Sequence, residues 1–141
     1  MTEAEPPHTT FWLAPGVHRL GAQKYDQVVP KKGNTYIGAP GAVLDGQRSN
    51  RYAFTGDTGS VTIRHLTIQN FGVRGGNNNE GVVNHDSASG WRIERSTVRK
   101  NAGAGVMLGS RNQVRDSCLS GNGQYGFNAY HANGVTDLTL A

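Results

Sequence analysis

The chain has 141 residues, a formal net charge of +4 and 20 glycines, about twice the average glycine usage of roughly 7%. Its length suits one domain, and charged residues make up only 17% of it against roughly 25% on average, which excludes a coiled coil or a long charged helix. No apolar run approaches the roughly 18 residues of a membrane span. The single cysteine, Cys118, excludes an internal disulfide framework. The net charge suits a polyanionic partner without requiring one.

The N-terminal segment shows no strand pattern. Residues 1–10 are therefore expected to form a flexible tail, and their sequence lacks the basic-then-apolar layout of a secretion signal. Residues 11–141 are expected to form one domain of about five to six coils. Within it, residues 11–20 are expected to be the opening coil, followed by short strands at 35–37 and 42–44.

The rest of the chain repeats. A separation of 21 residues relates Ile93 to Val114, and the same separation relates Val98 to Leu119. Upstream the repeat continues with an insertion, most of which falls at residues 72–80, where the Gly and Asn content is typical of a turn. A fixed period of this length predicts a stack of equivalent turns.

Within each repeat the apolar residues alternate over short stretches, at 106–108, 113–115 and 117–119, which is the two-residue period of a β-strand. Three strands per repeat indicate a solenoid in which each strand pairs in parallel with its equivalent one turn away, at about 4.8 Å. The predicted fold class is therefore all-β, a parallel β-helix with three sheets. A left-handed hexapeptide helix is the rival fold, but it needs a period that is a multiple of six, and 21 is not one.

The repeat also predicts which side chains stack in the core. Four columns are expected: Tyr52, Val82, Val106 and Phe127; Phe54, Asn84, Leu108 and Ala129; Ile37, Ile63, Ile93, Val114 and Val135; and Leu44, Ile68, Val98, Leu119 and Leu140. A fifth column mixes Leu66, Ser96, Ser117 and Leu138, whose hydroxyls could bond each other or the backbone. Asn84 is polar where the pattern expects Leu, so either it forms an internal amide ladder or the register shifts locally.

Alternation assigns other side chains to the outside. Arg64, Glu94 and Arg115 occupy one outward column with alternating charge, which predicts a cross-strand ion ladder before a binding surface. Cys118 is also expected to face outward, whereas Trp91 is expected to point inward like Ile93.

The segment 60–141, in which NAGAGVML returns as GNGQYGFNAY, and the opening stretches FWLAPGVHRL and TYIGAPGAVLDG resemble the pectate-lyase-like superfamily of right-handed parallel β-helices. In particular they resemble uncharacterised secreted β-helix repeat proteins of actinobacteria. The resemblance implies a right-handed β-helix, a polysaccharide partner and an extracellular location of the full-length protein, although this chain shows no signal peptide. It leaves the activity open, because the superfamily includes lyases, hydrolases and epimerases as well as tailspikes and adhesins.

The resemblance also implies a substrate groove on the outer face of the sheet that contains 81–85, 105–109 and 126–130, where alternation turns Val83, Met107 and Gly109 outward. The catalytic candidates on this face are His85, Asp86 and Glu80, since a lyase or epimerase needs a base near the uronate C5. Hydrolysis needs two carboxyl groups flanking the bond, and the lack of a paired-carboxylate motif favours lyase or epimerase chemistry. Alternatively, these residues are a loop acid and an exposed imidazole on a groove rim.

The substrate-binding candidates on the same face are Asn128, Tyr130, His131 and Arg74, with Tyr130 able to stack on a sugar ring. No metal and no cofactor are expected, because a calcium ion would require about six oxygen ligands and this face supplies fewer. The basic residues are scattered rather than gathered with aromatic ones, so no nucleic-acid partner is expected.

Two functions therefore remain open. One is a polysaccharide-active enzyme, and the other is a non-catalytic solenoid that binds glycans or serves a structural role like an adhesin or tailspike. The last residues, VTDLTLA, are expected to supply two strands of a further turn without a polar cap, so the chain is expected to be an N-terminal or truncated part of a longer protein.

Overall fold

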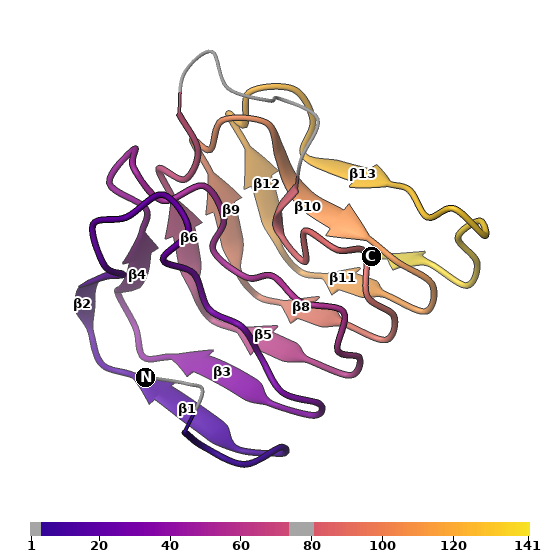
Figure 1. Ribbon diagram of the computed structural model, residues 1–141, viewed down its shortest axis with the longest axis horizontal. Helices are drawn as coiled ribbons and strands as arrows, with labels where there is room; N and C mark the ends of the chain where they lie inside the picture. Colours follow the sequence, from indigo (N-terminus) through magenta and orange to yellow (C-terminus); the bar gives the residue numbers. More distant parts are fainter. Residues whose placement is uncertain (1–3, 74–80) are drawn as a thin grey trace.

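The computed structural model describes residues 4–73 and 81–141 and shows an all-β chain wound into a parallel solenoid of about five turns (Figure 1). Each complete turn passes through sheet A, then sheet B, then sheet C, and strands of successive turns pair in parallel. The fold class predicted from the repeat is thereby confirmed.

The sheets differ in how many turns they cover. Sheet A has six strands and sheet B five, whereas sheet C has three strands extended by single bridges from Val28 to Phe54 and from Phe54 to Val83. Sheet A contains β1 (Thr10–Leu13), β3 (Thr35–Gly38), β5 (Thr62–Arg64), β8 (Arg92–Glu94), β11 (Gln113–Arg115) and β14 (Thr139–Leu140). Sheet B contains β2 (Gly16–Arg19), β4 (Ala42–Asp45), β6 (Thr67–Gln69), β9 (Thr97–Arg99) and β12 (Cys118–Ser120). Sheet C contains β7 (Gly81–Val83), β10 (Ala104–Leu108) and β13 (Phe127–Ala129).

The expected tail is partly joined to the solenoid. Residues 1–3 lie outside the described residues, and Thr10 already begins β1. The backbone N–H of His8 donates to the carbonyl of Lys32 at 2.9 Å, and the N–H of Thr9 donates to Asn34 Oδ1 at 3.1 Å. The residues just before β1 are therefore bonded to the second turn.

The middle turns stack as the repeat predicts. In sheet A one inner column contains Ile63, Ile93 and Val114, and in sheet B another contains Leu44, Ile68, Val98 and Leu119. Ile63 and Ile68 are fully buried, and burial of such a side chain contributes about 1.5–3 kcal/mol. Trp91 is fully buried and Cys118 is exposed, both as predicted.

The first turns differ from the prediction by one residue. Tyr36, not Ile37, pairs with Ile63 and occupies the inner column, so the assignment of Ile37 to the core is wrong. The reason is aromatic packing: the ring of Tyr36 stacks on Phe11 at 4.9 Å and meets the edge of Phe54 at 5.1 Å. Because the side chain of Tyr36 is buried, the pKa of its hydroxyl is raised. The side chain of the next residue, Ile37, faces outward.

The last turn is longer than the repeat predicts. Leu140, not Val135, pairs with Val114, so Leu140 belongs to sheet A and not below Leu119 in sheet B. The expected second strand is not seen, since β14 is the one strand that the structure describes after residue 130. The turn at His131–Gly134, closed by a hydrogen bond from the N–H of Gly134 to the carbonyl of His131, adds the residues that shift the phase.

Sheet C has a register shift at β7. Val83, not Val82, pairs with Val106, and Phe54, not Tyr52, bridges to Val83. The cause is a tight turn at Asn84, which has a φ of 56°. Its Oδ1 accepts from the N–H of Ala88 and its Nδ2 donates to the carbonyl of Ala88, both at 3.0 Å. Of the two alternatives for Asn84, the local register shift is confirmed and the amide ladder is wrong.

An amide ladder does form elsewhere, inside the turn that follows sheet B. The Oδ1 of Asn101 accepts from the N–H of Phe71 one turn earlier at 2.9 Å, and the Oδ1 of Asn122 accepts from the N–H of Asn101 at 3.2 Å. The Nδ2 of Asn101 donates to Asn122 Oδ1 at 3.0 Å. Each asparagine thereby satisfies backbone groups of the preceding turn that would otherwise be buried without a partner.

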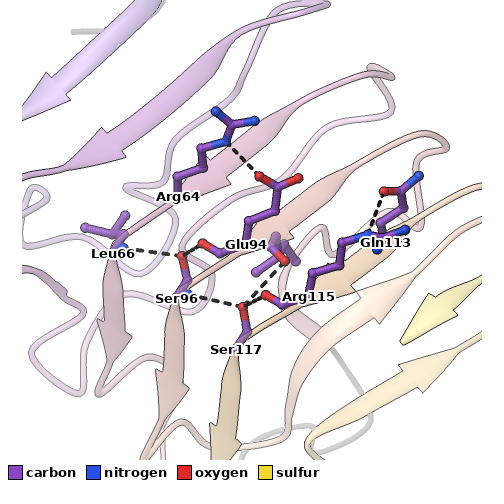
Figure 2. A network of polar contacts seen from close by, with 8 residues as sticks. Arg64, Leu66, Glu94, Ser96, Gln113, Arg115 and Ser117 are labelled. Atoms are coloured by element: carbon purple, nitrogen blue, oxygen red, sulfur yellow. Dashed lines mark hydrogen bonds and ion pairs between the residues drawn. The ribbon is translucent and has the colours of Figure 1, made fainter. Parts of the chain in front are cut away.

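The buried Ser96 and the half-buried Ser117 follow the same rule, as Figure 2 shows. The Oγ of Ser96 accepts from the N–H of Leu66 at 3.3 Å, and the Oγ of Ser117 accepts from the N–H of Ser96 at 3.1 Å. Their hydroxyls donate to backbone carbonyls, so the serines bond the backbone rather than each other.

On the outer face of sheet B, charged and amide side chains pair between turns. The carboxylate of Asp45 accepts from Gln69 Nε2 at 2.9 Å and from Asn70 Nδ2 at 2.8 Å. Burial by itself would raise the pKa of Asp45. The two side-chain hydrogen bonds, a third hydrogen bond from the backbone N–H of Gln47 and the positive charge of the nearby Arg19 together outweigh burial, so the pKa of Asp45 is lower than its ordinary value.

Candidate functional site

The predicted catalytic residues His85 and Asp86 follow β7 but do not act as a pair. The ring of His85 stacks on Tyr52 with ring centroids 4.0 Å apart, and its Nδ1 is buried with no partner among the described residues. The Oδ2 of Asp86 instead accepts the N–H of Gly56 at 2.5 Å. The structure therefore places His85 against an aromatic ring and uses Asp86 to bond the preceding turn. Glu80, the third catalytic candidate, lies outside the described residues.

Three of the predicted substrate-binding residues lie two turns away: Asn128 on β13, and Tyr130 and His131 directly after it. Asn128 is half-buried and in register with Met107, and Tyr130 is 67% exposed. The Nδ1 of His131 accepts the N–H of Asn133 at 3.2 Å. β13 and β7 both pair with β10, so the two groups of candidates are separated by two strand spacings, or about 10 Å. Arg74 lies outside the described residues.

Two further aromatic residues lie before and at the start of this strand. Tyr125 is 54% exposed and Phe127 is 42% exposed, although Phe127 pairs with the buried Val106. Phe127 is exposed because β13 is an edge strand of sheet C among the described residues. We refer to Tyr125, Phe127 and Tyr130 as the β13 aromatic edge.

The residues expected on the outer face of sheet C are buried at β7 and β10 and are largely inaccessible to solvent. The sequence predicts that Val83, Met107 and Gly109 line an open groove, but all three are buried. Val83 is buried because the register shift turns it inward, opposite Val106. A ligand can therefore approach the described part of this face at β13 more easily than at β7.

A hollow of about 760 Å³ lies elsewhere, along the corner where sheet A turns into sheet B. Its walls include Ile37 and Arg64 from the outer face of sheet A and Thr67 and Thr97 from that of sheet B. Since the outer faces of both sheets line one hollow, the corner is concave on the outside. A second hollow shares Arg64, His65 and Arg95 with the first and extends it. We refer to both together as the corner groove, lined by Trp12, Ile37, Gly38, Ala39, Pro40, Arg64, His65, Leu66, Thr67, Glu94, Arg95, Thr97, Arg115 and Asp116.

Single left-handed residues form this corner. His65, Arg95 and Asp116 have φ values of 54°, 47° and 49°, and they occupy the same position in successive turns. Such a residue bends the chain sharply between two strands. All three residues line the groove, so their side chains determine its chemistry.

The groove changes character along its length. Its N-terminal end is apolar, with Trp12 74% exposed beside Ile37 and Pro40. From the third turn on it carries charge, beginning with Arg64 and Arg95.

Part of this charge is paired, as Figure 2 shows. The Nε of Arg64 lies 2.8 Å from Glu94 Oε2, with side chains 44% and 22% exposed, and such a surface pair contributes at most about 1 kcal/mol. The Nε of Arg115 donates to Gln113 Oε1 at 3.2 Å. Of the expected ion ladder, the described residues therefore form the pair of Arg64 and Glu94, while Arg115 bonds Gln113 instead of Glu94. The side chains of Arg95 and His65 form no hydrogen bond or ion pair with any of the described residues.

The corner groove was not predicted from the sequence because of one register error at Ile37. The error placed Ile37 in the core, which hides the apolar wall that Ile37 forms with Trp12. The signal that could have revealed the groove is the alternation in FWL at the start of the chain. This pattern turns Trp12 outward when Phe11 points inward.

In residues 4–73 and 81–141, no group of three or more His, Cys, Asp or Glu side chains converges as a metal site would require. The described part of the chain also contains no helix of the length and apolarity that a bilayer crossing demands. Comparison of the chain with known protein families, with curated proteins and with solved structures gave no match.

Proposed function

We propose that this protein binds a polysaccharide without cleaving it, at the β13 aromatic edge on sheet C. The observation that carries the proposal is the exposed ring of Tyr130 beside Asn128. Sugar rings combine apolar C–H faces with hydroxyl groups. An aromatic ring can cover the first and an amide can hydrogen-bond the second.

The surroundings of Tyr130 support binding of an extended chain. Tyr125 and Phe127 add two exposed aromatic side chains within six residues of the chain, and exposed apolar surface of this kind is typical of interaction sites. In this proposal the protein is a β-helix of the pectate-lyase-like kind, and its full-length form acts outside the cell. Neither a cofactor nor a nucleic acid takes part.

Replacing Tyr130 with alanine is expected to weaken polysaccharide binding by up to about tenfold, since loss of an aromatic stacking contact costs about 0.5–1.5 kcal/mol and about 1.4 kcal/mol is one tenfold step in affinity. Titration calorimetry against a panel of neutral and uronate polysaccharides measures this. Tyr25→Ala is the matched control, because Tyr25 is 58% exposed in a loop near the opposite end of the solenoid. Equal affinities of the Tyr130→Ala variant and the unchanged protein would contradict the proposal.

A lyase or epimerase is the second candidate. It is favoured by His85, which is partly exposed on this face and whose imidazole would serve as a base. A lyase would give uronate polymers unsaturated ends, measured by absorbance, whereas an epimerase would invert C5 without cleavage, measured by NMR. In either case His85→Ala would lower the rate by about 10²–10⁴ while the protein stays folded. Unchanged rates in His85→Ala would remove His85 from the mechanism, and binding without product would favour the first proposal.

A further inference from the structure

We propose that the corner groove is a separate binding site for a small anionic amphiphile, a molecule with an extended apolar part and a carboxylate at one end. The apolar part lies on Trp12 and Ile37, and the carboxylate meets the guanidinium of Arg95. This site is on the opposite corner of the turn from the β13 aromatic edge, so it does not depend on the proposed polysaccharide function.

The N-terminal end of the groove supplies an apolar surface. Trp12 is 74% exposed, and it lines the same hollow as Ile37 and Pro40. Leaving an indole ring in water forgoes about 25 cal/mol for each Å² of apolar surface, which a bound hydrocarbon chain would recover. An apolar ligand therefore gains most of its binding free energy at this end.

The middle of the groove supplies a positive charge. Glu94 neutralises Arg64 through their 2.8 Å ion pair, and Arg95 lines the groove one residue further along the chain. Among the described residues the guanidinium of Arg95 has no bonded partner, and the same is true of the neighbouring imidazole of His65. A guanidinium binds a carboxylate through two parallel hydrogen bonds, so the positive charge of Arg95 in the middle of the groove selects an anionic group.

The walls of the groove disfavour a peptide as the occupant. Beyond the first turn, the strands that contribute to them are β3, β5, β8 and β11 of sheet A and β6 and β9 of sheet B, each of which pairs with a strand on both sides. Their backbone donors and acceptors are already used, so an extended peptide could not add to the sheet as it does at a free edge. Recognition here falls to side chains alone.

The dimensions also fit a small molecule. Trp12 and the residue beside Arg95 are three strands apart in sheet A, which corresponds to about 14 Å at about 4.8 Å per strand. The volume of about 760 Å³ falls within the range of about 300–1,000 Å³ that is typical of small-molecule sites. An extended medium-length acyl chain spans most of this distance.

The test uses three probes below their micelle concentrations: decanoate, decanol as its neutral counterpart, and hexanoate as a shorter acid. Titration calorimetry is expected to show decanoate binding at least about tenfold more tightly than either of the others, because only decanoate satisfies both ends of the groove. Equal binding of decanoate and decanol would overturn the role of Arg95, and equal binding of hexanoate would overturn the role of Trp12.

Three variants localise the site. Arg95→Gln is expected to weaken decanoate binding about tenfold and to leave decanol binding unchanged, whereas Glu94→Gln removes a nearby negative charge and is expected to tighten decanoate binding. Arg111→Gln is the matched control, since Arg111 is an exposed arginine that does not line the groove. Melting temperatures within about 2 °C of the unchanged protein establish that each variant folds.

Two outcomes would contradict the proposal as a whole. One is the absence of decanoate binding by the folded protein. The other is binding to phosphatidylglycerol vesicles without binding to decanoate, which would indicate a membrane surface in place of a small ligand. Neither outcome affects the polysaccharide proposal, because Tyr130 lies outside the corner groove.

Discussion

Replacing Trp91 with alanine is expected to lower the free energy of unfolding by about 3–5 kcal/mol, the range for removing a large aromatic side chain from a packed core. Trp91 is fully buried, and its indole Nε1 donates to the carbonyl of Thr58 at 2.8 Å. The substitution leaves a cavity and also removes the partner of that carbonyl. Urea denaturation followed by circular dichroism measures the change.

The chain contains its own control for this experiment. Its other tryptophan, Trp12, is 74% exposed, and Trp12→Ala is expected to change the free energy of unfolding by no more than about 0.5 kcal/mol. Equal destabilisation by the two substitutions would show that Trp91 does not occupy the core between sheets A and C.

Replacing Asn101 with leucine is expected to lower the free energy of unfolding by about 2–4 kcal/mol. The side chain of Asn101 is buried, its Oδ1 accepts from the N–H of Phe71 at 2.9 Å, and its Nδ2 donates to the carbonyl of Ile68 at 3.4 Å. Leucine has nearly the same size but leaves the N–H of Phe71 without a partner, at about 1–3 kcal/mol, and loses the bond to Ile68, at about 1 kcal/mol. The Phe71 amide should also exchange its hydrogen faster, which hydrogen-exchange measurements detect.

Asn133→Leu is the control for this second substitution, because Asn133 is exposed and its backbone N–H bonds His131. It is expected to change the free energy of unfolding by about 0.5 kcal/mol or less. If Asn101→Leu had no larger effect than Asn133→Leu, or if exchange at Phe71 were unchanged, the amide ladder would not support the turn after sheet B.

The repeat allowed the fold to be predicted without tertiary information. Ile63, Ile93 and Val114 stack as expected because their turns have regular strands and short corners. The burial of Trp91 and the outward position of Cys118 follow from the same alternation. The prediction that Ser96 and Ser117 require partners is also confirmed, since a buried hydroxyl must be hydrogen-bonded.

The candidate sites were less predictable. The sequence named His85 and Asp86 together, but side-chain contacts separate them, because His85 packs on Tyr52 while Asp86 bonds Gly56. Nothing in their spacing reveals either partner, since both partners lie one turn earlier in the chain. The roles of these residues, like those of Asn128, Tyr130 and His131, stay predictions.

The sequence by itself determined the parallel solenoid, its three strands per turn and the core of its middle turns, because a constant repeat length carries one phase from turn to turn. Only the tertiary structure decided the register at Tyr36, Val83 and Leu140, where inserted residues or tight turns interrupt that phase. A shift of one residue in a strand exchanges its inner and outer faces. Each of the two shifts by one residue therefore also changed which side chains face outward: the shift at Val83 turned that side chain inward, and the one at Tyr36 turned Ile37 into the corner groove.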